Sequence, residues 1–180
     1  GRYDYPPEVT GSIPQDNLSA YVDTARLIDE SGAQAIWVQH EYGIYGGAAG
    51  DHILTLLDRT TLPLIVTLHT VLERPSADER RVLEGLLRRA AKSVVMAERG
   101  REILARVYGA SAKHVVMIPH GVPDRPFVDP DTLKPQFGWQ GREVVLTFGL
   151  LAPGKGIETV IEALPAITAI HPELLYVVLG

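Results

Sequence analysis

The sequence predicts an α/β protein built from Rossmann-like, mostly parallel sheets. Three observations lead to this prediction. Short apolar runs alternate with segments of helical periodicity, each apolar run is nearly continuous, and polar residues or glycines follow the ends of the runs. Continuous apolar strands separated by helices are typical of parallel sheets, because the connecting helices cover the faces of such a sheet.

Six apolar runs are the predicted strands. Polar residues follow three of them, namely His40 and Glu41, His69, and His120. Ligands of open parallel sheets sit beyond the carboxyl ends of the strands, so we expect these four side chains at one edge. The predicted strands cover residues 35–39, 62–68, 93–96, 115–118, 144–148 and 174–180.

Helix signals fill the gaps between these runs. Asp16 or Asn17 can cap the first helix, and Ser76 with Glu79 has the spacing of a capping box. Pro165 lies inside the last helix and is expected to bend or split it. The predicted helices cover about residues 17–30, 50–58, 76–90 and 98–108, with the last one starting at residue 157.

Composition narrows the class of protein. The chain has 180 residues with 46% hydrophobic and 22% charged residues, which is ordinary for a globular protein. Its net charge of -5 argues against nucleic acid as a partner, which usually requires a basic face. The absence of cysteine excludes disulfides and thiolate metal sites and suits a cytoplasmic location. No apolar run reaches the roughly 20 residues of a membrane span, and no signal-peptide pattern opens the chain.

The chain divides into two predicted domains. Residues 1–122 form the first, residues 123–141 contain several prolines and glycines and are predicted to be a linker, and residues 142–180 begin the second. Both ends look cut, because Gly1 is not a methionine and the last strand stops where its functional loop would begin. We expect a fragment, truncated at both ends, with exposed apolar surface on residues 142–180 that an oligomeric partner can cover.

A glycine-rich loop follows the strand at residues 144–148. It contains Gly149, Gly154 and Gly156 with Lys155 between the last two, and a helical pattern leaves it. This layout directs backbone N–H groups and a helix N-terminus at a phosphate, and the lysine adds a positive charge. A P-loop would require Ser or Thr at position 156 to hold Mg²⁺, so a nucleotide hydrolase is disfavoured.

The order of four short motifs resembles the retaining glycosyltransferases of family four, which have the two-domain GT-B architecture. The resemblance runs from about Ala35 to Gly180. Leu150 stands where the family usually has arginine, His120 replaces asparagine, and Ala97 replaces serine. The motifs are Val66–Thr70, Val94–Glu98, Ile118–Val122 and the donor loop from Phe148 to Gly156.

This resemblance implies a donor site on the second domain. It implies a nucleotide-diphosphate sugar as donor substrate, no bound cofactor and no protein-bound metal. Lys155 would neutralise the donor diphosphate, and backbone N–H groups near Gly149 and Gly156 would bind the same oxygens. Charge that develops on the leaving diphosphate would then be stabilised.

The resemblance also implies sites on the first domain. His69 would lie near the transferred sugar and orient or polarise the reacting groups. Gly46 and Gly47 would allow close approach of a ligand to the backbone. The acceptor, a sugar, lipid or polysaccharide, would lie near them, and the strand-end residues His40, Glu41 and His120 are weaker candidates for contacts with it.

Other interpretations stay open. The strand-end histidines can be purely structural, and the whole chain can be a non-catalytic α/β phosphate-binding or regulatory domain. A zinc site through His40, His69 and His120 lacks the short ligand spacing of metal motifs. Five basic residues form one edge of the predicted helix at residues 76–90 and the segment after it, namely Arg80, Arg81, Arg88, Arg89 and Lys92. This basic edge can be a solvated helix face or a peripheral contact with anionic lipid.

Overall fold

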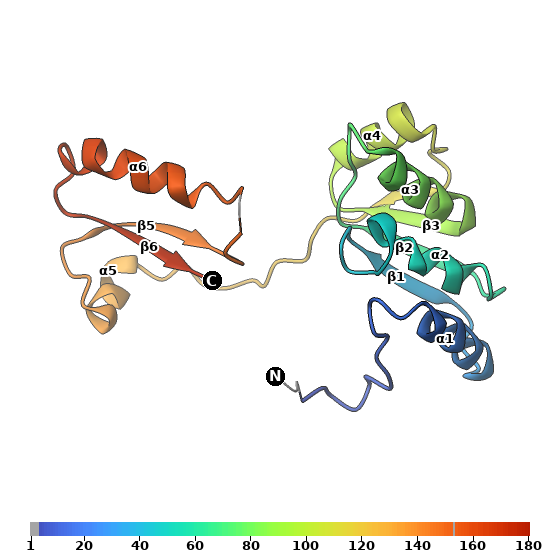
Figure 1. Ribbon diagram of the computed structural model, residues 1–180. Coiled ribbons are helices and arrows are strands. Elements are labelled where there is room, and N and C mark those ends of the chain that lie inside the picture. The colour runs from blue at the N-terminus through green and yellow to red at the C-terminus, as the bar shows by residue number, and fades with distance from the viewer. Residues whose placement is uncertain (1–3, 153) are drawn as a thin grey trace. The chain divides into compact units, whose positions relative to one another are not determined.

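The computed structural model describes residues 4–152 and 154–180. The chain forms two compact units, one ending at Val122 and the other beginning at Pro123 (Figure 1). Each unit contains its own parallel sheet with its own helices.

The first unit contains a four-stranded parallel sheet. Its strands follow one another in space in the order of the chain, so that each strand pairs with the next. Such parallel neighbours need a crossover, and a helix supplies it in every case. The strands are β1 (Ile36–His40), β2 (Leu64–Leu68), β3 (Ala90–Val95) and β4 (Val115–Met117).

Two helices of this unit begin at the predicted caps. The side chain of Asn17 caps the first helix, and Ser76 and Glu79 form both bonds of a capping box. Gly109 ends the last helix in the left-handed conformation that glycine adopts readily. The helices are α1 (Leu18–Glu30), the short 3₁₀ helix η1 (Ala48–Gly50), α2 (His52–Leu57), α3 (Ala77–Arg89) and α4 (Glu98–Tyr108).

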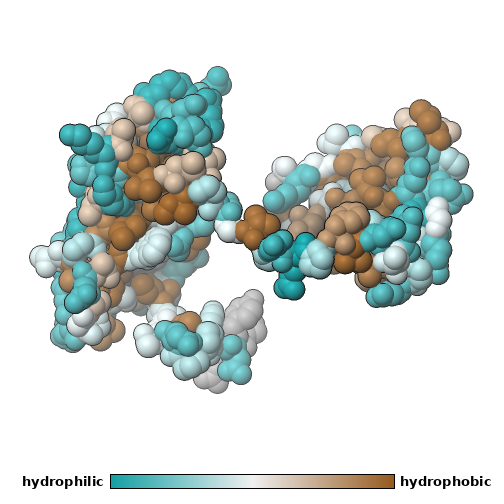
Figure 2. Space-filling model, turned by 180° about the vertical axis from the view of Figure 1, so that it is seen from behind, coloured by the Kyte–Doolittle hydropathy of each residue, from teal (hydrophilic) through white to brown (hydrophobic). Residues whose placement is uncertain are grey.

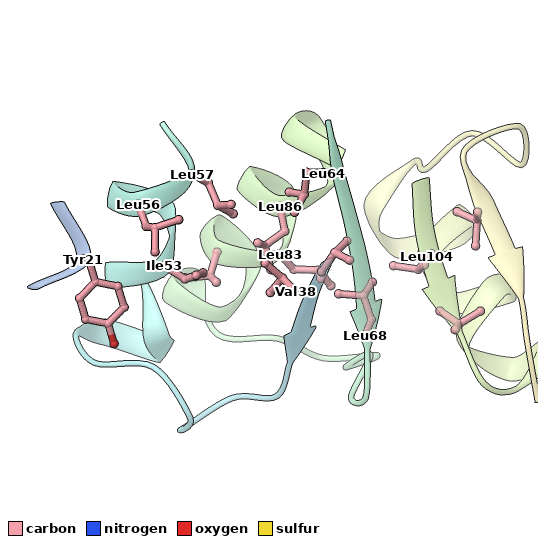
Figure 3. Packing of buried hydrophobic residues seen from close by; sticks show 14 of the residues in the cluster. Tyr21, Val38, Ile53, Leu56, Leu57, Leu64, Leu68, Leu83, Leu86 and Leu104 are labelled. Carbon is pink, nitrogen blue, oxygen red and sulfur yellow. The ribbon is translucent and has the colours of Figure 1, made fainter. Parts of the chain in front are cut away.

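The hydrophobic core lies between the sheet and these helices. Alternate residues of β1 and β2 point into it, so Val38, Val66 and Leu68 are almost completely buried. Leu83 and Leu86 of α3 fill the space opposite, and Figure 3 shows them pointing toward these strands. Each fully buried side chain of this size contributes about 1.5–3 kcal/mol, so the core fixes which strand residues face the helices.

The other face of the sheet remains accessible. Its side chains include Trp37, which is 61% exposed, and Val116, which is 37% exposed. The view from behind shows hydrophobic residues gathered on the first unit, between more polar borders (Figure 2). The nearly continuous apolar strands predicted cover on both faces. In the described part of this unit the second face is only partly covered, with Thr67 and Val94 buried beside the exposed Trp37.

The second unit is smaller. Its two strands pair in parallel along their full length, and a helix connects them. Two short helices lie within the range 123–141 that was expected to be a linker. The elements are α5 (Pro130–Leu133), the 3₁₀ helix η2 (Lys134–Phe137), β5 (Glu143–Phe148), α6 (Ile157–Thr168) and β6 (Leu174–Leu179).

Pro165 does not split α6. The helix runs from Ile157 to Thr168 as one element with Pro165 inside it. Proline lacks an N–H group, so the bond to the carbonyl four residues earlier is missing at this position. The N–H of Ala169 bonds to the Pro165 carbonyl, which continues the backbone hydrogen bonding beyond the proline.

The second unit has little interior. All fully buried residues in the described part of the chain lie in the first unit. Large apolar side chains of β5, the glycine loop and β6 remain accessible, including Phe148 at 75% and Leu179 at 55% exposure. The apolar surface expected on residues 142–180 is therefore present in the structure.

Arg89 holds α3 to the loop between α2 and β2. Its guanidinium group donates to the carbonyl oxygens of Leu57, Thr60 and Leu62 at 3.3, 2.7 and 2.8 Å. Arg89→Met keeps the apolar stem but removes these bonds, so we expect a loss of about 2 kcal/mol in unfolding free energy. Urea denaturation measures this loss. The matched control is the exposed neighbour Arg88 as Arg88→Met, and an equal loss in both variants would contradict this role.

Amide hydrogen exchange tests the difference between the two units. Because β5 and β6 pack few buried side chains, their amides should exchange faster than those of β1 and β2. Mass spectrometry of peptides from the two sheets, after the same labelling time, compares them directly. Equal protection of the two sheets would contradict this expectation.

Candidate functional site

The carboxyl ends of β1 and β2 lie side by side. His40 pairs with Leu68 in the sheet register, and the N–H of His69 donates to the His40 carbonyl at 2.9 Å. The next residues then meet across the two strands, where the Thr70 hydroxyl donates to Glu41 Oε2 at 2.8 Å. Parallel pairing thus brings the predicted residues Glu41 and His69 to the same edge.

His69 is exposed at this edge and is held from one side. Its Nε2 atom lies 2.8 Å from Oε1 of Gln39, and its ring centroid lies 6.3 Å from that of His120. Residues from the ends of β3 and β4 complete an open cavity of about 330 Å³ beside the two histidine rings. His69 and His120 therefore line a space in which a small polar group fits.

The N-terminus of α4 borders the same cavity. Ala97 occupies the N-cap position, and no side chain caps the helix there. The first N–H groups of a helix lack partners within the helix, and they favour a negative charge. Arg99 also lines the cavity, but its guanidinium group forms ion pairs with Glu73 and Glu102.

Glu73 braces the loop that follows His69. It forms ion pairs with Arg99 at 3.0 Å and with Arg106, both from α4. These pairs lower the pKa of Glu73, with the hydrogen bond from Arg106 as the main cause. The Tyr108 hydroxyl donates to the Leu72 carbonyl at 2.9 Å in the same loop. Local sequence patterns do not reveal this brace, because its members are 26 to 36 residues apart.

His40 lies in the interior rather than at the open edge. Its side chain is fully buried between Tyr42 and Tyr45, with ring centroids 5.0 and 6.2 Å away, and neither ring nitrogen has a hydrogen-bond partner among the described residues. Burial lowers the pKa of His40 to about 4, which keeps the ring neutral. The predicted direct contact of His40 with an acceptor does not fit this position.

The two glycines of the loop after β1 have a structural reason to be glycine. A Cβ atom on Gly46 would collide with the Gln15 carbonyl and the His52 ring, and one on Gly47 would collide with Asp51 and His52. Gly46 is buried as well. The predicted approach of a ligand to the Gly46 backbone does not fit, because the chain itself fills that space.

The glycine loop of the second unit leads from β5 into α6. The side chain of Lys155 turns back toward Gly149, whose Cβ position would lie 4.0 Å from Lys155 Nζ. Gly156 is the N-cap of α6 in the left-handed conformation and gives the helix no side-chain cap. Lys155 is therefore the residue directly before the N-cap of a 12-residue helix.

The expected role of the Gly149 amide is corrected by the structure. The N–H of Gly149 donates to the carbonyl of Leu179 at 2.9 Å and so extends the sheet. This amide is not available to a phosphate. What Gly149 does provide is a backbone with φ of 130°, which a residue with a side chain rarely adopts. Pro153 of the same loop lies outside the described residues.

The basic edge on α3 is largely engaged within the protein. Arg80 bonds to Glu84 and the Val107 carbonyl, and Arg81 forms ion pairs with Asp51 and Asp78. The described residues contain no group of three His, Asp or Glu side chains that could hold a metal ion. None of the helices in this part of the chain is long and apolar enough to cross a bilayer.

The burial of His40 predicts a pH dependence of stability. Its folded pKa of about 4 lies below the unfolded value of roughly 6.5, so only the unfolded chain gains this proton between the two values. Unfolding free energy should fall by about 2 kcal/mol from pH 7 to pH 5 through this group and stay constant above pH 7. Urea denaturation across this range measures the decrease.

His40→Leu removes the titrating group and should flatten the pH dependence by that amount. His114→Gln is the matched control, because His114 is an exposed histidine of the same unit, and it should keep the full slope. An unchanged slope in His40→Leu would show that other groups cause the dependence.

The chain is similar to known proteins in sequence and in structure. Residues 2–125 match the model of Glycosyltransferase Family 4. The whole chain superposes on 54% of the crystal structure of a glycosyltransferase from Rickettsia africae ESF-5, with a TM-score of 0.58 and 14% sequence identity. The chain thus spans about half the length of that protein, and the likeness confirms the Rossmann-like α/β class. No curated protein sequence matches. Because the family match covers more than half of the chain, the chain belongs to Glycosyltransferase Family 4.

Proposed function

We propose that the full-length protein transfers a hexose from a nucleoside-diphosphate sugar to an acceptor hydroxyl, with retention of the anomeric configuration. Family membership supports sugar transfer. The turn between β5 and α6 supports the choice of donor, because it combines a cation with a helix N-terminus. The donor phosphates bind to the second unit and the acceptor to the first.

The observation that carries this proposal is the position of Lys155. Its ammonium group lies near Gly149, and Lys155 directly precedes Gly156, the N-cap of α6, which gives the helix no side-chain cap. As the bond from the anomeric carbon to the phosphate oxygen breaks, the electron pair stays on the diphosphate. A cation and helix amides at that position stabilise the developing charge, which is a large contribution to catalysis.

The acceptor reacts on the face from which the diphosphate leaves. Its oxygen bonds to the anomeric carbon, and its proton passes to the departing phosphate oxygen, so no enzyme nucleophile is required. In this scheme His69 orients or polarises the reacting groups from the first unit. Its exposed ring and the cavity beside it suit that role.

The proposal extends to the location of the protein, its contact with lipid and its partners. A cytoplasmic location goes with a chain free of cysteine. Contact with anionic lipid would rest mainly on Arg88, since the other four basic residues of that edge have partners within the protein. A second copy or another part of the full-length protein would cover the accessible apolar side chains of β5 and β6.

Binding of nucleoside diphosphates by the full-length protein tests the donor site. Lys155→Ala removes the ammonium group from an exposed turn, so the fold should persist while UDP, GDP and ADP protection against thermal unfolding falls. For the diphosphate that binds best, we expect a loss of affinity of about tenfold or more, as for one charge-assisted hydrogen bond. Calorimetric titration measures the change.

Lys113→Ala is the matched control, because Lys113 is an exposed lysine of the first unit and should leave binding unchanged. Equal affinity of Lys155→Ala and the unmodified protein would refute the donor site. Binding that depends on Lys155, but without any sugar transfer to any acceptor tested, would favour a phosphate-binding regulatory domain instead.

A further inference from the structure

A row of hydrogen-bonded side chains lies on the face of the sheet opposite the helices. Trp37 and Gln39 of β1 share this face with Thr67 of β2 and with His69 just beyond it. The Trp37 indole N–H donates to the Thr67 hydroxyl at 2.8 Å, and Gln39 pairs with Thr67 in the sheet register. Gln39 therefore lies beside Trp37 of its own strand and Thr67 of the next strand, which are hydrogen-bonded to each other.

The contact between Gln39 and His69 bears on which ring nitrogen carries the proton. Oε1 of Gln39 lies 2.8 Å from Nε2 of His69. A carboxamide oxygen only accepts hydrogen bonds, so in this orientation of the Gln39 amide the bond is donated by Nε2–H of His69. A neutral imidazole has one donor and one acceptor nitrogen, so Nδ1 then carries the lone pair. No described residue forms a hydrogen bond with Nδ1.

We propose that Gln39 is a positioning residue that holds His69 in the Nε2-protonated tautomer and leaves Nδ1 as an acceptor at the cavity edge. The functional role of this contact rests on the proposed sugar transfer, whereas the tautomer of His69 does not depend on it. An acceptor nitrogen suits a histidine that orients a donor or acceptor hydroxyl, since each hydroxyl has one proton to give. Gln39 acts through His69 and needs no contact with substrate.

Rigid backbone supports this assignment. Gln39 lies within β1 and His69 directly follows β2, and the His69 N–H continues the ladder to the His40 carbonyl at 2.9 Å. The two side chains therefore project from neighbouring strands at fixed register. Groups held by strands are positioned more accurately than groups on loops, which suits an orienting contact.

Imidazole ¹⁵N shifts of the full chain test the proposal directly, because a protonated nitrogen and one with a lone pair differ widely. His69→Gln identifies the His69 signals, and the sample is kept at a pH where the ring is neutral. We expect Nε2–H in the unmodified protein and in Gln39→Glu, which keeps an acceptor oxygen. Gln39→Leu should give a mixture of tautomers, and Gln136→Leu, an exposed glutamine of the second unit, should leave the spectrum unchanged.

An Nδ1–H ring in the unmodified protein would overturn the proposal, and so would an unchanged tautomer in Gln39→Leu. In the full-length enzyme, Gln39→Leu should lower kcat by about 10- to 100-fold without changing the donor KM. An unchanged kcat alongside a shifted tautomer would overturn the positioning role. A full-length protein without any transfer would refute the proposed function and leave the tautomer result standing.

Discussion

The candidate site depends first on the parallel pairing of β1 with β2. The register aligns Ile36 with Leu64 and continues without a shift to His40 and Leu68. One further bond, from His69 N–H to the His40 carbonyl, extends it past the strand end. The same register sets Gln39 beside His69 and Glu41 beside Thr70. A slip by one residue would turn every one of these side chains to the opposite face.

Hydrophobic burial on the helix side keeps that register in place. Val38, Val66 and Leu68 lose almost all solvent contact, and a slipped strand would expose them at a cost of about 1.5–3 kcal/mol each. The opposite face carries the exposed Gln39 and the buried Thr67, whose hydroxyl accepts a hydrogen bond from the Trp37 indole N–H. The core thus specifies the positions of residues that take no part in it.

Local signals could be predicted from the sequence because they involve residues only a few positions apart. The cap at Asn17, the capping box of Ser76 with Glu79, and the end of α4 at Gly109 are of this kind. The parallel class and the gathering of Glu41, His69 and His120 at one edge also followed from the order of the elements. Topology determines both.

Contacts between distant residues could not be predicted in this way. Glu73 meets α4, Gln39 meets His69, and the Gly149 amide meets Leu179, each across at least 26 positions. The placement of His40 had a usable signal, because it is two residues after the buried Val38 and shares its side of the strand. The expectation of an exposed His40 overlooked this alternation.

Among the described helices of eight or more residues, α4 and α6 begin without a side-chain cap, and the cations beside their N-termini differ. Both α4 and α6 carry a glutamate in the first turn, so that residue type does not separate them. At α4, however, Arg99 is neutralised by Glu73 and Glu102. At α6, Lys155 forms no ion pair with a described residue, and its ammonium group lies near Gly149 in the same loop. A diphosphate would therefore gain a full opposing charge at α6, whereas at α4 it would have to displace two carboxylates first.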